Sequence, residues 1–135
     1  MSKRVQEIQG IGPKYAEKLK QEGIQTIENL LEVGGSKPGR KVLASKTAIS
    51  EKYILNWVNI CDLFRIKGVA GHFAELLEGV GIDTVSKLCT RNAGSLANKM
   101  MELNNEKHLC KVAPNPAMVA KWIKQAKELD SKVMQ

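Results

Sequence analysis

The sequence predicts an all-α fold in which two repeats of about 60 residues pack into one compact domain over residues 1–135. Three observations support this prediction. The chain repeats its own pattern of glycines and apolar residues, its apolar residues recur at helical spacing, and no alternating apolar run is long enough for a strand. A length of 135 residues suits one domain, or two small units that share a core.

The internal repeat organises the chain. Residues 8–30 and 66–88 match without a gap at an offset of 58, and Trp57 and Trp122 extend the match at an offset of 65 after a longer loop. We therefore expect a first repeat over residues 1–64 and a second over 65–135. The identical pairs are Ile8/Ile66, Gly10/Gly68, Ala16/Ala74, Glu17/Glu75, Leu19/Leu77, Gly23/Gly81, Ile24/Ile82, Thr26/Thr84 and Leu30/Leu88.

Helix positions follow from apolar spacing and from capping residues. Residues 14–22 and 72–80 have helical spacing, and each stretch stops at a Gly-Ile pair, as when glycine takes the left-handed conformation after a last helical turn. Thr26 in the first repeat, and Asp83 or Thr84 in the second, are placed to cap the next helix. Further helices are predicted over 38–46, 51–64, 93–106 and 117–129, with a short, frayed helix over 3–7.

The predicted core contains the repeated apolar residues and both tryptophans. Tyr15 and Phe73 also occupy equivalent repeat positions, which favours equivalent packing over a role in stacking nucleic-acid bases. The residues expected to be buried are Ile11, Leu19, Ile24, Leu30, Trp57, Val69, Leu77, Ile82, Leu88 and Trp122.

The charge balance favours a polyanionic partner. Lysine and arginine total 21 against 14 acidic residues, and the formal charge is +3 in residues 1–64 and +4 in residues 65–135. No window approaches the roughly 20 apolar residues of a membrane span and no signal-peptide pattern is present, so we expect no membrane association and a cytoplasmic location. The spacing of the three cysteines and two histidines indicates no metal site, disulfide framework or cofactor.

Two glycine-rich segments, residues 10–13 and 68–71, lie directly before short predicted helices. Glycine permits positive φ and lets a ligand approach the backbone closely. Free amides at such a turn, together with the positive end of the helix that follows, favour an anion such as phosphate. Ile11 and Val69 are expected to point into the core and to hold the turns rigid.

Residues 8–19 resemble the helix-hairpin-helix motif, with Ile8, Gly10, Ile11, Gly12, Ala16 and Leu19 at the matching positions. Across nearly the whole chain, two such motifs with added helices and a Trp-containing helix resemble a small tandem helix-hairpin-helix family classed as a domain of unknown function. The wider superfamily implies sequence-nonspecific DNA binding through backbone amides to phosphates, in some members with a monovalent cation held by the hairpin carbonyls.

Carried over by position, the resemblance implies amide donors at both turns. They are Gly10, Ile11, Gly12 and Lys14 in the first repeat, and Gly68, Val69, Gly71 and His72 in the second. The second copy departs from the motif at Ala70, so its turn is expected to be displaced by one residue or closed to a phosphate. Side chains expected to add phosphate contacts are Lys14, Lys18, Lys37, Arg40, Lys41 and Lys67.

The expected function is noncatalytic, sequence-nonspecific binding of nucleic acid, with duplex DNA as the expected partner. The alternative is a protein-interaction or scaffolding module whose glycines serve only the close packing of helices. Acidic residues near the turns, such as Glu17 and Glu75, favour this alternative because they oppose a positive field. No nucleophile elbow, P-loop, H-E-x-x-H motif or magnesium-binding carboxylate cluster is present, so no catalytic residues and no enzymatic activity are expected.

Overall fold

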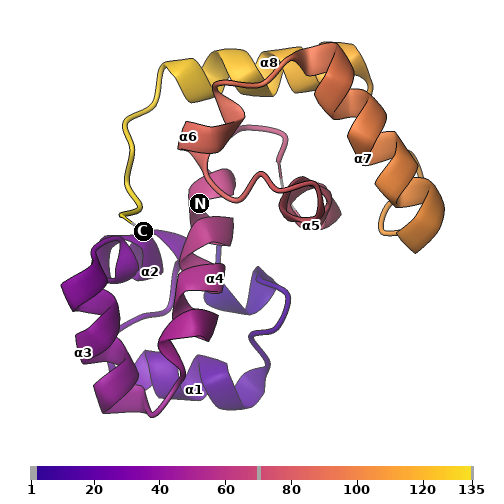
Figure 1. Ribbon diagram of the computed structural model, residues 1–135. Coiled ribbons are helices and arrows are strands. Elements are labelled where there is room, and N and C mark those ends of the chain that lie inside the picture. The colour runs from indigo at the N-terminus through magenta and orange to yellow at the C-terminus, as the bar shows by residue number, and fades with distance from the viewer. Residues whose placement is uncertain (1–2, 70, 135) are drawn as a thin grey trace. The chain divides into compact units, whose positions relative to one another are not determined.

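The computed structural model describes residues 3–69 and 71–134 (Figure 1). Within these ranges every regular element is helical, and the one strand-like feature is an isolated antiparallel bridge between Arg4 and Thr26. The predicted all-α fold class is therefore confirmed. The described residues form two compact units: unit 1 contains residues 3–62 and 132–134, and unit 2 contains residues 63–69 and 71–131.

Unit 1 consists of one 3-10 turn followed by helices (Figure 1). Its elements are η1 (Val5–Glu7), α1 (Pro13–Gln21), α2 (Ile27–Gly34), α3 (Lys37–Thr47) and α4 (Glu51–Leu63), of which α4 contributes its last residue to unit 2. The expected helix over residues 3–7 is reduced to η1, because backbone groups of Lys3 and Val5 form hydrogen bonds with the segment around Thr26 instead of within a helix. The Val5 amide donates to the Gln25 carbonyl at 3.1 Å, and the Lys3 carbonyl accepts from the Ile27 amide at 2.9 Å.

In unit 2 the ends of α5, α7 and α8 lie within one or two residues of the predicted ends, and α6 is the helix for which only a cap was predicted. Its elements are α5 (His72–Gly79), α6 (Val85–Leu88), α7 (Ala93–Lys107) and α8 (Pro116–Lys127). The cap of α6 is Thr84 rather than Asp83, since the Thr84 hydroxyl accepts from the Lys87 amide at 3.3 Å. Asp83 instead pairs with the Lys87 ammonium at 3.0 Å.

Both Gly-Ile pairs end a helix as predicted. Gly23 and Gly81 have φ of +79° and +91°. The next amide turns back across each helix end: Ile24 donates to the Leu19 carbonyl at 2.9 Å, and Ile82 donates to the Leu77 carbonyl at 2.8 Å. This pattern is the Schellman cap, which pairs otherwise unsatisfied carbonyls and directs an apolar residue back onto the helix.

The predicted core is confirmed, because each of the ten residues expected to be buried is buried. The two tryptophans lie beneath the two glycine turns. A Cβ built on Gly10 would lie 3.4 Å from the indole nitrogen of Trp57, and one on Gly68 would lie 3.0 Å from that of Trp122. A tryptophan packed this closely against each turn leaves little room for a side chain at either glycine.

The last described residues pack on unit 1. Val133 is buried, and the Met134 amide donates to the Gly35 carbonyl at 2.8 Å. The Arg40 guanidinium donates to the Gly34 carbonyl at 2.8 Å, the Gly35 carbonyl at 3.2 Å and the Met134 carbonyl. Arg40 thereby joins the start of α3 to the C-terminal segment.

Candidate nucleic-acid interface

The first glycine turn is a tight reverse turn over residues 8–11. The Ile11 amide donates to the Ile8 carbonyl at 3.1 Å, and Gly10, in the third position, has φ of +97°. This combination is typical of a type II turn, which favours glycine at that position. Ile11 is buried below the turn as expected, whereas Gly10 and Gly12 lie at the surface.

The amides after this turn are available to a ligand. Gly12 is the N-cap of α1 and no side chain caps the helix. The amides of Gly12 and Lys14 donate to no protein acceptor within residues 3–69 and 71–134, and a Cβ at Gly12 would meet nothing within 4 Å. The N-terminus of α1 therefore presents unpaired donors towards open space.

Two of the predicted amide donors are wrong. The Ile11 amide is already bonded to Ile8, and the Val69 amide donates to the Ile66 carbonyl at 3.2 Å in the same way. Each donor is used to close its own turn, so it cannot also reach a phosphate. The physical reason is the turn type, since a type II turn bonds the amide of its fourth residue to the carbonyl of its first.

Most other helices in the described part of the chain begin with a polar side-chain cap, which contrasts with α1 and α5. Thr26 caps α2, Ser36 caps α3, Thr84 caps α6, Asn92 caps α7 and Asn115 caps α8, each through a side-chain oxygen. The caps of α1 and α5 are glycines without a side-chain bond. A Ser, Thr or Asn cap satisfies one of the free amides internally, whereas a glycine leaves it to solvent or to a ligand.

The second turn reverses the backbone in the same way as the first, but the helix that follows it starts at a different position. Gly68 has φ of +93°. The Gln125 side chain accepts from the Lys67 amide at 2.9 Å and donates to the Lys67 carbonyl at 3.1 Å. The helix that follows starts at His72, with Gly71 as its cap at φ +52°. Relative to the first repeat the turn keeps its position, because the Val69 amide bonds the Ile66 carbonyl, and only the start of the helix is displaced by one residue. Ala70, on which the expectation of a displaced turn rested, lies outside the described residues.

Charge distinguishes the two turns. Helix α1 carries Lys14, Lys18 and Lys20 with one carboxylate, Glu17. Lys14 and Lys18 are one helical turn apart and so lie on the same side of α1.

Helix α5 instead carries Glu75 and Glu78, and the imidazole Nδ1 of His72 lies 3.0 Å from Glu75 Oε2. Two basic residues precede α5: Lys67, which is exposed, and Arg65, whose guanidinium donates to the Asp130 carbonyl at 2.8 Å. The helix after the first turn therefore carries more positive charge than the helix after the second.

Arg40 and the basic cluster around it do not belong to either turn. Arg40 was expected to bind phosphate, but only 3% of it is exposed and its guanidinium is bonded to three backbone carbonyls. That expectation is wrong, because the C-terminal segment covers a side chain that would otherwise have lain on a helix surface.

Lys37 and Lys41 are exposed on α3. Lys46 near the end of α3 pairs with Glu22 at the end of α1, with 3.9 Å between the charged atoms. Helix α3 therefore meets α1 at the end opposite Gly12, and Lys37 and Lys41 lie further back along α3.

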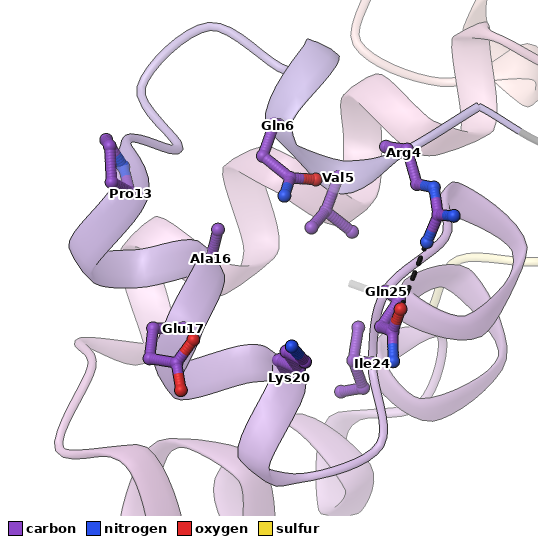
Figure 2. A pocket seen from close by; sticks show the side chains of 9 residues that line it. All are labelled: Arg4, Val5, Gln6, Pro13, Ala16, Glu17, Lys20, Ile24 and Gln25. Carbon is purple, nitrogen blue, oxygen red and sulfur yellow. Dashed lines mark hydrogen bonds between the residues drawn. The ribbon is translucent and has the colours of Figure 1, made fainter.

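A pocket of about 340 Å³ lies between η1 and α1 (Figure 2). Its floor contains the buried residues Val5, Ala16 and Ile24, and its rim carries Glu17 and Lys20. Arg4 also lines it, with its guanidinium bonded to the Gln25 side chain at 3.0 Å. Gln6 and Pro13 complete the lining, and Pro13, the first residue of α1, places the pocket beside the turn.

Searches of the described residues for two other kinds of site gave negative results. No group of three or more His, Cys, Asp or Glu residues in residues 3–69 and 71–134 is arranged to hold a metal ion. None of the helices in those same ranges has both the length and the apolar character needed to cross a bilayer.

Comparison with protein families gives one match. The model of the family described as Domain of unknown function (DUF4332) matches residues 9–129. The chain belongs to this family. No curated protein and no solved structure gives a significant match. The DUF4332 match includes both glycine turns and both buried tryptophans.

Two residues of this DUF4332 chain that sequence analysis missed lie beside the turns. One is Gln125, which braces the second turn. The other is Tyr53, which is half-exposed on α4 with its ring centroid 6.3 Å from that of Tyr15. The only signal for Tyr53 is its position one helical turn before Trp57, and the repeat concealed it because Met118 stands at the corresponding position before Trp122.

The acidic end of α5 in this DUF4332 chain also carries a titrating group. Burial, and then the nearby carboxylates of Asp83 and Glu75, raise the pKa of Glu78 from 4.5 to about 7. Each of these effects penalises the charged form, so Glu78 gains its charge near neutral pH, at a cost to the folded state.

Stability should therefore fall as pH rises through this range. Between about 4.5 and about 7 the folded protein holds the Glu78 proton more tightly than the unfolded chain does, so the free energy of unfolding decreases with pH. Glu78→Gln, which stays neutral, should remove that part of the decrease. Urea midpoints of both proteins at about pH 5 and about pH 8 measure it, and a parallel fall in both would contradict the assignment to Glu78.

Proposed function

We propose that the protein is a noncatalytic module that binds nucleic acid through its phosphates without sequence preference, with duplex DNA as a ligand. We further propose that its two units are helix-hairpin-helix repeats, in which the glycine turn joins the two helices of each hairpin. The observation that carries the proposal is the start of α1, where Gly12 and Lys14 present unpaired amides beside an exposed turn.

Phosphate is the ligand that these groups suit best. Unpaired amides and the aligned peptide dipoles make a helix N-terminus favourable for an anion. Lys14 and Lys18 supply mobile cations on the same helix, and such contacts provide sequence-independent affinity. Backbone amides and lysines at phosphates carry no information about the bases, so little sequence preference is expected.

Unit 1 supplies the stronger site in this proposal. The second turn leads into Glu75 and Glu78, which oppose a phosphate at the start of α5. We therefore assign Gly10, Gly12, Lys14 and Lys18 to the principal interface. Lys67, Gly68, Gly71 and His72 form at most a weaker contact.

The acidic second turn supports the alternative function for unit 2, a surface for a protein partner. Glu75 and Asp83 lie close enough to Glu78 to raise its pKa, so three carboxyl groups gather at α5 and the residues after it, with Lys87 paired to Asp83. A basic protein surface is the partner that such a region would attract.

A titration of fluorescent random-sequence duplex DNA at about 50 and about 200 mM salt tests the proposed function. If two or three phosphates are neutralised, affinity should fall about 10- to 40-fold between these salt concentrations. Lys14→Gln with Lys18→Gln should weaken binding and flatten the salt dependence. The matched pair Lys37→Gln with Lys41→Gln removes the same charge from another helix, α3, and should have a smaller effect. Absence of binding at the lower salt concentration would overturn the proposal.

A further inference from the structure

An exposed aromatic residue lies next to the proposed phosphate site. Tyr53, on the first turn of α4, is 48% exposed. Its neighbours in the aromatic cluster are more enclosed, since Tyr15 is half-buried and Trp57 is only 5% exposed. Tyr53 is thus the solvent-facing member of this cluster.

The cluster connects Tyr53 to the first glycine turn. The indole of Trp57 packs under Gly10, and the ring of Tyr15, in the first turn of α1, has its centroid 5.2 Å from that of Trp57. Tyr53 contacts both, with ring centroids 6.3 Å apart in each case. It lies one turn of α4, about 6 Å of helix length, from the tryptophan that supports the turn.

This exposed ring is specific to unit 1. In unit 2 the equivalent tryptophan, Trp122, contacts Phe73 with ring centroids 5.5 Å apart, and the residue one turn before it is Met118. The unit with the lysine-bearing helix and the open Gly12 cap is therefore also the unit with a surface aromatic. Lys52, also exposed, adds a positive charge beside Tyr53.

We propose that Tyr53 stacks on an unpaired base of a DNA strand whose phosphate is held at the start of α1. Unit 1 would then prefer single-stranded DNA to duplex DNA. This inference rests on the proposed function, because the phosphate contact places the strand. In a duplex each base is already stacked and paired, whereas a single strand can offer a base face to an aromatic ring at little cost. Stacking of this kind tolerates every base, in keeping with binding that lacks sequence preference.

The test compares one oligonucleotide, carrying a single 2-aminopurine, as a single strand and as a duplex. Wild-type protein should bind the single strand more tightly and quench its 2-aminopurine fluorescence on stacking. Tyr53→Leu should lower single-strand affinity about 5- to 150-fold, the range that follows from loss of one stacked base. Its duplex affinity should change less than about 2-fold. Tyr53→Phe keeps the ring and should retain both the affinity and the quenching.

The outcomes separate the two proposals. If wild-type protein binds neither DNA, the phosphate-binding function itself fails. If wild-type protein binds DNA, but Tyr53→Leu weakens both forms equally or neither, stacking by Tyr53 is wrong and phosphate binding stands. Tyr53→Met, which places the residue of unit 2 at this position, is the second variant if the leucine protein does not fold. Unchanged 2-aminopurine fluorescence with bound wild-type protein would overturn the stacking proposal without any variant.

Discussion

Replacing Gly12 with aspartate should abolish most DNA binding while leaving the protein at least as stable as before. Gly12 has φ of −84° and ψ of −176°, the extended conformation that any N-cap residue adopts, and a side chain there meets no neighbour within 4 Å. An aspartate cap would accept the free amides at the start of α1, and this exchange from glycine is worth a few tenths of a kcal/mol to the helix.

The same carboxylate would occupy the position proposed for the phosphate. Each hydrogen bond to a charged group contributes about 1.5–3 kcal/mol, so loss of even one lowers affinity about 10- to 150-fold. Anisotropy titration with duplex DNA and urea unfolding of the same preparations measure both effects. A gain in stability combined with a loss of binding is the expected signature.

Gly12→Ala is the matched control because it adds a Cβ without a charge or a cap. It should lower stability by less than about 1 kcal/mol and keep DNA affinity within a few-fold. Gly71 in the second turn is unsuitable for this experiment, since its φ of +52° strains any side chain. Wild-type affinity in Gly12→Asp would show that the α1 amides bind no phosphate, and the glycine would then serve the fold alone.

Arg40→Ala should be the most destabilising single substitution among the basic residues selected from the sequence. The change removes a buried guanidinium from the carbonyls of Gly34, Gly35 and Met134. The Gly35 carbonyl keeps its bond from the Met134 amide, whereas the other two carbonyls lose the donor that Arg40 supplied. Buried polar groups that lose a charged partner cost several kcal/mol between them, so we expect a decrease of about 2–4 kcal/mol in the free energy of unfolding. Urea unfolding followed by far-ultraviolet circular dichroism measures it.

Lys41→Ala provides the comparison, since Lys41 is the next residue along α3 and is exposed. Its effect on the free energy of unfolding should stay within about 0.5 kcal/mol. DNA affinity of Arg40→Ala, measured where the variant remains folded, should equal that of the wild type. Equal stability of the two alanine variants, or a selective loss of DNA affinity in Arg40→Ala, would restore the surface role that the sequence suggested for Arg40.

The elements that could be predicted from sequence are those made by contacts between near neighbours. Gly23 and Gly81 end their helices through bonds that reach back five residues, and Thr26 caps α2 through a bond from the amide three residues ahead. Residue types at such short spacing show whether the bond can form. The burial of Trp57 and Trp122 was also predictable, because two copies of one pattern must pack in the same way.

The candidate site could be predicted only in part. The sequence pattern located both turns, but it could not show that the Ile11 and Val69 amides form the hydrogen bonds that close them. It also could not show that Tyr53 remains at the surface while Tyr15, in the same cluster, is half-buried. Which amide stays free and which ring stays exposed depends on three-dimensional neighbours that come from other helices.

By itself the sequence determined the helical class, the repeat, the glycine helix ends and the apolar residues of the core, because each depends on a pattern of residues at short spacing. Only the tertiary structure decided the fate of Arg40, whose guanidinium meets a carbonyl 94 residues further along the chain. It also decided that the end of α3 meets α1 at the end away from Gly12, where Lys46 pairs with Glu22. Such partners are chosen by how whole helices pack, and side-chain spacing along one helix holds no information about that choice.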